Sequence, residues 1–244
     1  MPGELRVGTS GWYYPHWRGI FYPARMSSED FLPFYAVHFN TVELNNSFYQ
    51  LPTRENFEAW ASRVPPGFIF SIKASRFITH RKKLKDPQPS LSRLLGNTSG
   101  LGSKLGPVLF QLPPHWRANP SRLSDFVRAL PGPHRYVFEF RDPSWFTEEI
   151  YGILREARSA LCVASSPSFP EEREITADFV FLRFHGGKEL YGSDYSRAEL
   201  REYAQWVKPV LDRGMDVYAY FNNDAYGYAI GNALEFRSLL TAQV

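Results

Sequence analysis

Short apolar stretches recur along the whole chain, and their length and their content of β-branched and aromatic residues favour strands. We predict strands at residues 5–10, 41–45, 68–74, 108–112, 136–141, 161–164, 179–185 and 217–222. Helical signals lie between them. In residues 27–39 a capping box starts at Ser27 or Ser28, and in residues 196–214 Ser196 is the expected N-cap and Gly214 the stop.

This alternation predicts a TIM (β/α)₈ barrel, because a parallel strand reaches its neighbour through a crossover that is usually a helix. A doubly wound open sheet is the alternative fold. It is disfavoured because no Gly-x-Gly-x-x-Gly follows the first strand and the chain is long for a flavodoxin-like fold. No internal repeat or linker divides the sequence, so we expect residues 1–244 to form a single domain.

Parity sorts each predicted strand into a face under the helices and a face toward the barrel axis. The early inward positions are apolar, and the late ones are polar. The late set comprises Glu43, Asn45, Lys73, Gln111, Glu139, Arg141, Arg183, His185 and Asn222. Since the C-terminal ends of barrel strands carry the active site, we expect these side chains to meet at one mouth.

The charges of this set leave two interpretations open. Glu43 and Glu139 could neutralise the cations in a buried ionic layer that needs no ligand. However, Lys73, Arg141 and Arg183 outnumber the two carboxylates, and His185 would add a further positive charge if protonated. We therefore favour a site that binds an anion.

Composition narrows the class of protein. The chain is 43% hydrophobic and 22% charged, as in globular proteins, with a net charge of +3 that is too small for a dedicated nucleic-acid binder. The sequence contains no secretory signal and no apolar run long enough for a membrane span, so we expect a cytoplasmic protein. Cys162 is the single cysteine, lies in a predicted strand, and is expected to be inert core.

Several loops carry candidate ligand contacts. Aromatic residues follow the strands, including Trp12, Tyr13 and Tyr49, and they favour a ring-bearing ligand over a hydrophobic lid. Gly186, in a loop that reads HGGK, would let the backbone approach a phosphate, although it also fits an ordinary turn. The basic run 75–87, which contains His80, is either a solvated helix or a contact for a phosphate backbone.

The sequence resembles the YecE-like family, a domain of unknown function with a TIM-barrel fold. The resemblance rests on VGTSGWYYPHWRGIFYP at 7–23, FNTVELNNSFYQLP at 39–52, FSIKASRFITH at 70–80, LGPVLFQLPP at 105–114, FEFRDPSW at 138–145, FLRFHG at 181–186 and YAYFNND at 218–224. It covers nearly the whole chain and implies a barrel without supplying an activity. Asp142 and Ser165 depart from the family pattern, which often has His and Asp at these positions.

We therefore predict an enzyme with hydrolase- or lyase-type acid–base chemistry on a phosphate-bearing sugar, nucleotide or nucleic acid. Arg141, Arg183 and Lys73 would hold the anion, Glu43 or Glu139 would act as base or nucleophile, and His185 would move protons. Gln111, Asn45 and Asn222 would orient the substrate.

Other functions stay open. A non-catalytic module that binds an anion or nucleic acid is the alternative, and Asp142 and Ser165 strengthen it. A glycosidase built on Glu43 and Glu139 is also considered, as is a phosphodiesterase or endonuclease-like barrel with one divalent metal on Glu43, Glu139 and His185. No cofactor is otherwise expected, and the oligomeric state is not indicated.

Overall fold

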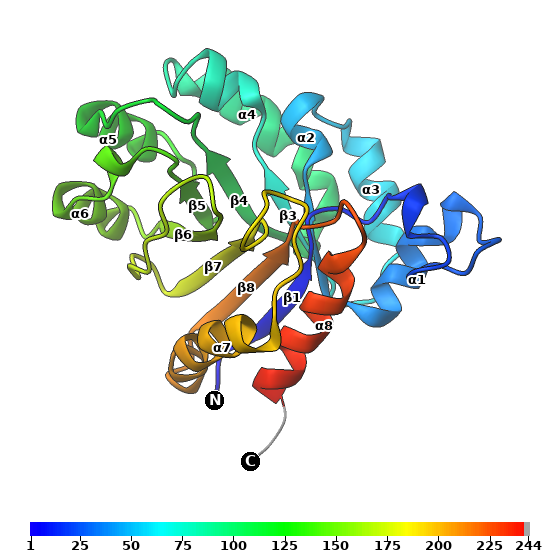
Figure 1. Cartoon of the computed structure of the whole chain (residues 1–244). Helices are drawn as coiled ribbons and strands as arrows, with labels where there is room; N and C mark the ends of the chain where they lie inside the picture. Colours follow the sequence, from blue (N-terminus) through cyan, green and yellow to red (C-terminus); the bar gives the residue numbers. More distant parts are fainter. Residues whose placement is uncertain (242–244) are drawn as a thin grey trace.

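A computed structural model describes residues 1–241, and its centre is a sheet of eight parallel strands (Figure 1). The strands are β1 (Leu5–Thr9), β2 (Thr41–Leu44), β3 (Ile69–Lys73), β4 (Leu105–Gln111), β5 (Tyr136–Glu139), β6 (Ala160–Ser165), β7 (Phe179–Phe184) and β8 (Asp216–Phe221). Each pairs with its neighbour in the order β1-β8-β7-β6-β5-β4-β3-β2. The predicted TIM-barrel fold is confirmed, and the largest boundary difference is that β4 begins three residues before the predicted Val108.

Helices cover the outside of this sheet (Figure 1). They are α1 (Phe31–His38), α2 (Asn46–Tyr49), α3 (Arg54–Ser62), α4 (Pro87–Thr98), α5 (Pro120–Arg128), α6 (Glu148–Glu156), α7 (Arg197–Asp212) and α8 (Tyr228–Thr241). One crossover differs from the regular pattern, because residues 166–178 between β6 and β7 contain no helix. Pro167 and Pro170 lie in this segment, and proline opposes helix continuation.

Of the two predicted helix starts, only the second has its capping box; the N-cap residue of α1, Asp30, makes no side-chain capping bond. Ser27 caps a 3₁₀ turn (Ser28–Asp30) that leads into α1. Ser196 and Glu199 form a reciprocal capping box at the start of α7, and Gly214 follows the end of that helix at φ +83°. No helix within residues 1–241 is both long and apolar enough to cross a membrane.

The barrel closes between β1 and β2 through a side chain. Within residues 1–241 these two strands form no backbone ladder. The Tyr35 hydroxyl of α1 lies between them: it accepts from Thr9 N at 2.8 Å and donates to Thr41 O at 3.1 Å. A Cβ on Gly8 would lie 2.2 Å from the Thr41 carbonyl oxygen, so only glycine permits this approach. The barrel is therefore nearly closed, and the Tyr35 hydroxyl bridges β1 and β2 where backbone hydrogen bonds are absent.

Two apolar layers confirm the predicted parity. The layer under the helices includes Phe138, Leu182 and Phe184. The barrel interior holds a separate cluster of Leu109, Val137, Ala160, Cys162, Ala164, Phe179, Phe181, Tyr218 and Tyr220. Cys162 is thus packed core, and burial raises the pKa of its thiol well above the ordinary value. This interior fills the barrel below the polar strand ends.

Candidate functional site

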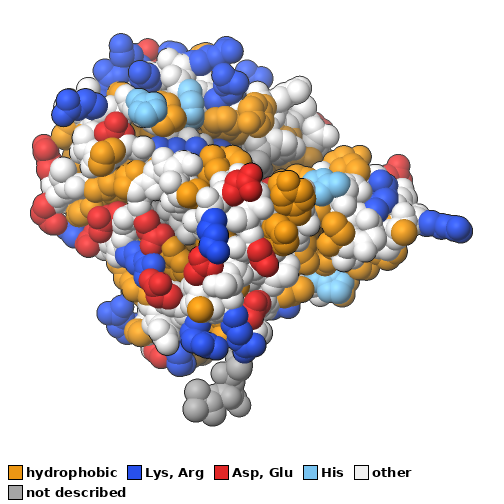
Figure 2. Space-filling model, in the orientation of Figure 1, with side chains coloured by type: hydrophobic (Ala, Val, Ile, Leu, Met, Phe, Trp, Pro, Cys, Tyr) orange, Lys and Arg blue, Asp and Glu red, His pale blue; other side chains and the backbone are white. Residues whose placement is uncertain are grey.

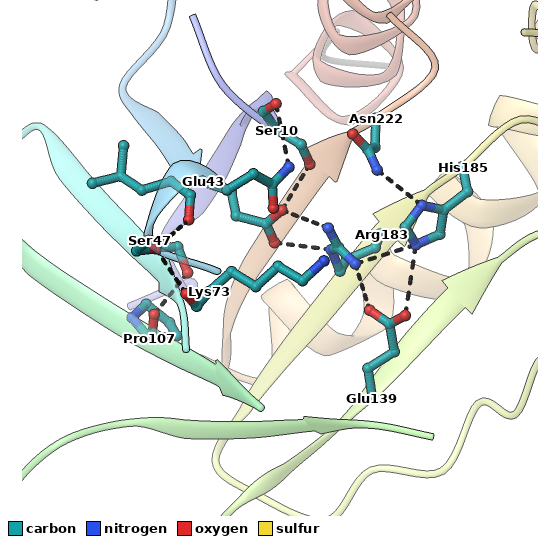
Figure 3. Close-up of polar contacts among 12 residues, drawn as sticks. Ser10, Glu43, Ser47, Lys73, Pro107, Glu139, Arg183, His185 and Asn222 are labelled. Carbon is teal, nitrogen blue, oxygen red and sulfur yellow. Dashed lines mark hydrogen bonds and ion pairs between the residues drawn. The ribbon is translucent and has the colours of Figure 1, made fainter. Parts of the chain in front are cut away.

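Arg183 is the centre of a polar cluster at the C-terminal ends of the strands (Figure 3). Its Nε and Nη2 donate to the two carboxylate oxygens of Glu43 at 2.9 and 2.7 Å. Its Nη1 donates to Glu139 Oε2 at 2.5 Å. All three side chains are fully buried, and Ser10 Oγ donates to Glu43 Oε1 at 2.8 Å. One guanidinium therefore joins carboxylates from β2 and β5.

Arg141 shares Glu139 with Arg183. Its Nε donates to Glu139 Oε1 at 2.7 Å, and its side chain is 13% exposed. Burial alone would raise the pKa of Glu139, but the two guanidiniums outweigh that effect and hold it well below its ordinary value. The Arg141 guanidinium lies 4.4 Å above the ring of Phe169. Among the described residues its two Nη groups have no hydrogen-bond partner, so they are available to a ligand.

Lys73 is left without a carboxylate. Its side chain runs from β3 toward Arg183 (Figure 3), and its Nζ lies 4.2 Å from the centre of the Phe48 ring. In the described part of the chain Nζ has no hydrogen bond or ion pair. Burial, followed by the repulsion of Arg183, lowers the pKa of Lys73 to about 7. Near neutral pH this amine is therefore partly unprotonated, the state that accepts a proton or attacks a carbon.

His185 differs from the prediction because it does not add a positive charge. It is fully buried, and burial together with Arg183 holds its pKa well below the ordinary value. Donors face both ring nitrogens, because Asn222 Nδ2 lies 3.1 Å from Nδ1 and Arg183 Nη1, which can only donate, lies 3.4 Å from Nε2. That nitrogen lies 3.9 Å from Glu139 Oε1. His185 is therefore a neutral ring beside the carboxylate.

His80 is a second neutral histidine. Its ring contacts Phe48 at 5.1 Å between ring centres, and its Nδ1 lies 2.9 Å from Thr79 Oγ1. Partial burial, then the charges of Lys73 and Arg141, lower its pKa to about 4. His80, in the predicted basic run, therefore lies near Lys73 and Arg141 without a charge of its own, and its contact with a ligand stays a prediction.

Three other predicted residues have different surroundings from those expected. The Gln111 side chain donates to the backbone oxygen of Leu112 at 2.8 Å. Gly186 N donates to the Tyr195 hydroxyl at 3.0 Å, and a Cβ here would lie 2.2 Å from Glu189 O, so this glycine closes a turn. Its backbone N–H is not offered to a phosphate. Tyr49 is 73% exposed on α2 and lies outside the cluster.

Asp142 and Ser165 have local structural roles. Asp142 accepts from Ser144 N and Ser144 Oγ at 3.0 and 2.6 Å, which lowers the pKa of its carboxyl and caps a 3₁₀ turn (Pro143–Trp145). Ser165 Oγ accepts from the Tyr195 hydroxyl at 2.9 Å. Within residues 1–241 neither side chain forms a hydrogen bond with the side chains around Arg183, although the carbonyl oxygen of Ser165 accepts from His185 N at 2.9 Å.

Trp12, Tyr13 and Asn45 gather beside the mouth. They line a cavity of about 540 Å³ between the loop after β1, the end of β2 and helices α1 and α3. Ser10 belongs to both places, because it lines this cavity and donates to Glu43. The predicted aromatic contacts therefore form a compartment of their own next to the charged cluster.

The basic run 75–87 after β3 does not form the regular helix that one of the two predictions assumed. Phe77–Arg81 form one π-helical turn, and Arg81, Lys83 and Lys85 are exposed. Figure 2 shows Lys and Arg side chains gathered over the region of α4 and α5. This surface is compatible with a phosphate backbone and equally with solvent.

The donors do not suit the single metal considered above. Glu43 and Glu139 are both engaged by Arg183, and a cation would have to displace its guanidinium. No three His, Cys, Asp or Glu side chains within residues 1–241 come together in a way that could hold a metal ion.

Comparison with known proteins identifies the family. A profile described as "Protein of unknown function DUF72" matches residues 6–244. The chain belongs to this family. UPF0759 protein YunF of Bacillus subtilis is 26% identical over 97% of this chain and 94% of its own length. UPF0759 protein YecE of Escherichia coli is 31% identical over 59% of this chain and 51% of its own length. The predicted YecE-like membership is confirmed, and it carries no established activity.

Solved structures of the family agree with the fold. A DUF72 family protein from Thermotoga maritima has a TM-score of 0.89 and 30% identity, covering 98% of this chain and 100% of its own. Another, from Enterococcus faecalis, has a TM-score of 0.80 and 20% identity, covering 99% of each chain. The second likeness shows the fold alone.

The sequence missed two supports of the cluster. Ser10 is not among the predicted site residues, yet its Oγ donates to Glu43. Phe169 lies in the irregular segment 166–178, under Arg141 and 5.4 Å from the His185 ring. Only its aromatic side chain could have indicated a role, because residues in a loop do not alternate between two faces as residues in a strand do.

Proposed function

We propose that the mouth of the barrel is the active site of an enzyme that binds a small phosphate-bearing sugar or nucleotide and transfers a proton. Arg141 would bind the anion and Lys73 would act as the base. The observation that supports this most is the amine of Lys73, which lies over the Phe48 ring, has a pKa lowered to about 7 and has no carboxylate partner within residues 1–241. Bases with a pKa near the working pH are effective in proton transfer.

The proposed roles differ from the prediction that Arg141, Arg183 and Lys73 bind the anion together. Each of the three guanidinium nitrogens of Arg183 already donates to Glu43 or Glu139, so we assign Arg183 to positioning. The Nη groups of Arg141 offer the two parallel donors that suit a phosphate. His185 would return a proton, while Asn222, 3.1 Å from its Nδ1, would hold its ring.

The charges also rank the alternative chemistries. A glycosidase needs one carboxylic acid with a raised pKa, whereas the pKa of Glu139 is held low. Non-catalytic anion binding is the second candidate, because both carboxylates are already paired with guanidinium. This candidate would keep the Arg141 contact and need no base.

Turnover separates the two candidates. We would screen phosphate esters of sugars and nucleotides with the native chain and with Lys73→Met, Arg141→Met and Glu139→Gln. The matched control is Lys208→Met on α7, whose side chain is 59% exposed. Loss of at least about 10²-fold in kcat for Lys73→Met, with a raised KM for Arg141→Met, supports the enzyme. Tight binding without product in the native chain supports the binding module, and unchanged activity in Glu139→Gln contradicts the proposed site.

A further inference from the structure

The amine of Lys73 has different surroundings from those of other lysines in the chain. Lys104 Nζ donates to two backbone carbonyl oxygens at 2.6 and 2.7 Å, and Lys208 pairs with an aspartate. Lys73 Nζ has no such contact within residues 1–241 and lies 4.2 Å from the centre of the Phe48 ring. A phenyl ring supplies no oxygen atom that could accept a hydrogen bond from the amine. Lys73 is therefore held at the mouth without a polar partner.

Lys73 and Arg141 can both be reached from the mouth. Lys73 is only half-buried, and the Arg141 side chain is 13% exposed, with two Nη groups that have no hydrogen-bond partner among the described residues. The side chains of Arg183, Glu43 and Glu139 have no exposed surface. A ligand that enters the mouth therefore meets one amine and one guanidinium, and both are free to bind it.

The charges of the cluster balance without Lys73. The guanidiniums of Arg141 and Arg183 are paired with the carboxylates of Glu43 and Glu139, and the two histidines nearby are neutral. Burial and the repulsion of Arg183 lower the pKa of Lys73 to about 7, so near neutral pH about half of the molecules hold a free amine. The lone pair of a free amine attacks carbonyl carbons.

We propose that Lys73 forms an imine with the aldehyde or ketone of a sugar phosphate whose phosphate is bound by Arg141. Nζ attacks the carbonyl carbon and forms a C–N bond, and the carbonyl oxygen leaves as water with the two protons of the amine. A proton taken up by the imine nitrogen then gives an iminium, whose positive charge is offset by the bound phosphate. The inference rests on the proposed function of the mouth and narrows its substrates to sugar phosphates with a free carbonyl.

The experiment compares glycolaldehyde phosphate with glycolaldehyde, two aldehydes that differ only in the phosphate. Each is incubated with the full chain near neutral pH and with cyanoborohydride, which transfers a hydride to the imine carbon and leaves a stable secondary amine. Peptide mass spectrometry locates the adduct. We expect the phosphate probe to label Lys73 about ten-fold faster than glycolaldehyde does, because charge-assisted hydrogen bonds to Arg141 hold it in place.

Two comparisons locate the reaction. Lys73 should be labelled roughly 10²-fold faster than Lys208, which is 59% exposed, because the amines of surface lysines are generally protonated near neutral pH. Arg141→Met should remove the preference for the phosphate probe, whereas Arg213→Met, at an exposed position after α7, should keep it. Inorganic phosphate should slow labelling by glycolaldehyde phosphate in the native chain, which tests the anion contact without a variant.

The proposal is overturned if Lys73 stays unlabelled, if the two probes label it at the same rate, or if the adduct is found on surface lysines instead. It is also overturned if a folded Arg141→Met variant keeps the preference, or if inorganic phosphate does not slow the labelling. Trapping needs no turnover, so the two proposals can fail separately. Labelling of Lys73 without any product in the substrate screen contradicts the proposed enzyme alone, whereas turnover without labelling contradicts the imine alone.

Discussion

Arg183 and Glu43 face each other in two parallel hydrogen bonds, Nε to Oε2 at 2.9 Å and Nη2 to Oε1 at 2.7 Å, and neither side chain is exposed. The third nitrogen of the guanidinium reaches Glu139. Paired charges of this kind tolerate burial only while the pairing is complete. The energetics of the whole mouth therefore depend on one side chain from β7.

We expect Arg183→Met to lower the free energy of unfolding by about 3–5 kcal/mol, because two buried carboxylates lose their shared partner. Urea denaturation followed by circular dichroism measures this. The control is Arg173→Met, whose pairs with Glu171 and Glu202 are partly exposed and whose loss should cost less than about 1 kcal/mol. An equal loss of unfolding free energy in the two variants would contradict the stabilising role of the buried Arg183 pairs.

Lys73 should make stability depend on pH. Its pKa is lowered from 10.5 to about 7 in the folded chain, so between these values the unfolded chain binds more protons. Stability should therefore rise from about pH 7 to pH 10.5. Below pH 7 it should be lowest with respect to this group, because Lys73 is then charged in the folded chain as well. Lys73→Met should flatten this slope and stabilise the protein most below pH 7, by at most about 5 kcal/mol. If the free energy of unfolding changed with pH equally in the native chain, Lys73→Met and Lys208→Met, the assignment of this pH dependence to Lys73 would be refuted.

His80 should report the charge of its neighbour. Its pKa of about 4 reflects partial burial first and the positive charges of Lys73 and Arg141 next. In Lys73→Met we expect the pKa to rise while staying below 6.5, because the burial remains. A titration of the His80 ring protons by NMR measures the shift. Lys85→Met, in the exposed part of the basic run, should leave the value near that of the native chain.

Tyr35 should matter more than its position on a helix suggests. Its hydroxyl joins Thr9 N to Thr41 O, so Tyr35→Phe leaves a buried backbone N–H without an acceptor. The expected cost is about 1–3 kcal/mol. Faster amide hydrogen exchange at Thr9 would locate the effect in the seam, and Tyr49→Phe on the exposed face of α2 should change neither measurement.

Much of the site was predictable because parity in a strand needs only the sequence. It placed Glu43, Glu139 and Arg183 together from three distant segments, and the structure joins them through hydrogen bonds. It even held for Arg141, which lies two residues beyond the end of β5. Alternation continues past the last ladder hydrogen bond because the chain stays extended.

The pairing itself could not be predicted. Three cations and two carboxylates can be matched in several ways, and the sequence contains no distances. Arg183 takes part in both pairs because its guanidinium offers several donors, which leaves Lys73 alone. The neutral state of His185 depends on how deeply it is buried, and parity says nothing of depth.

The segment between β6 and β7 has a consequence for how this barrel can diversify. It has no helix, yet it contributes the Phe169 ring on which the Arg141 guanidinium rests. A helix in this place would fix the backbone by packing, whereas an irregular crossover can change in length and sequence without disturbing the strand order. Grafting residues 166–178 from a relative would therefore change the surroundings of Arg141 while the hydrogen bonds that join Glu43, Glu139 and Arg183 stay in place.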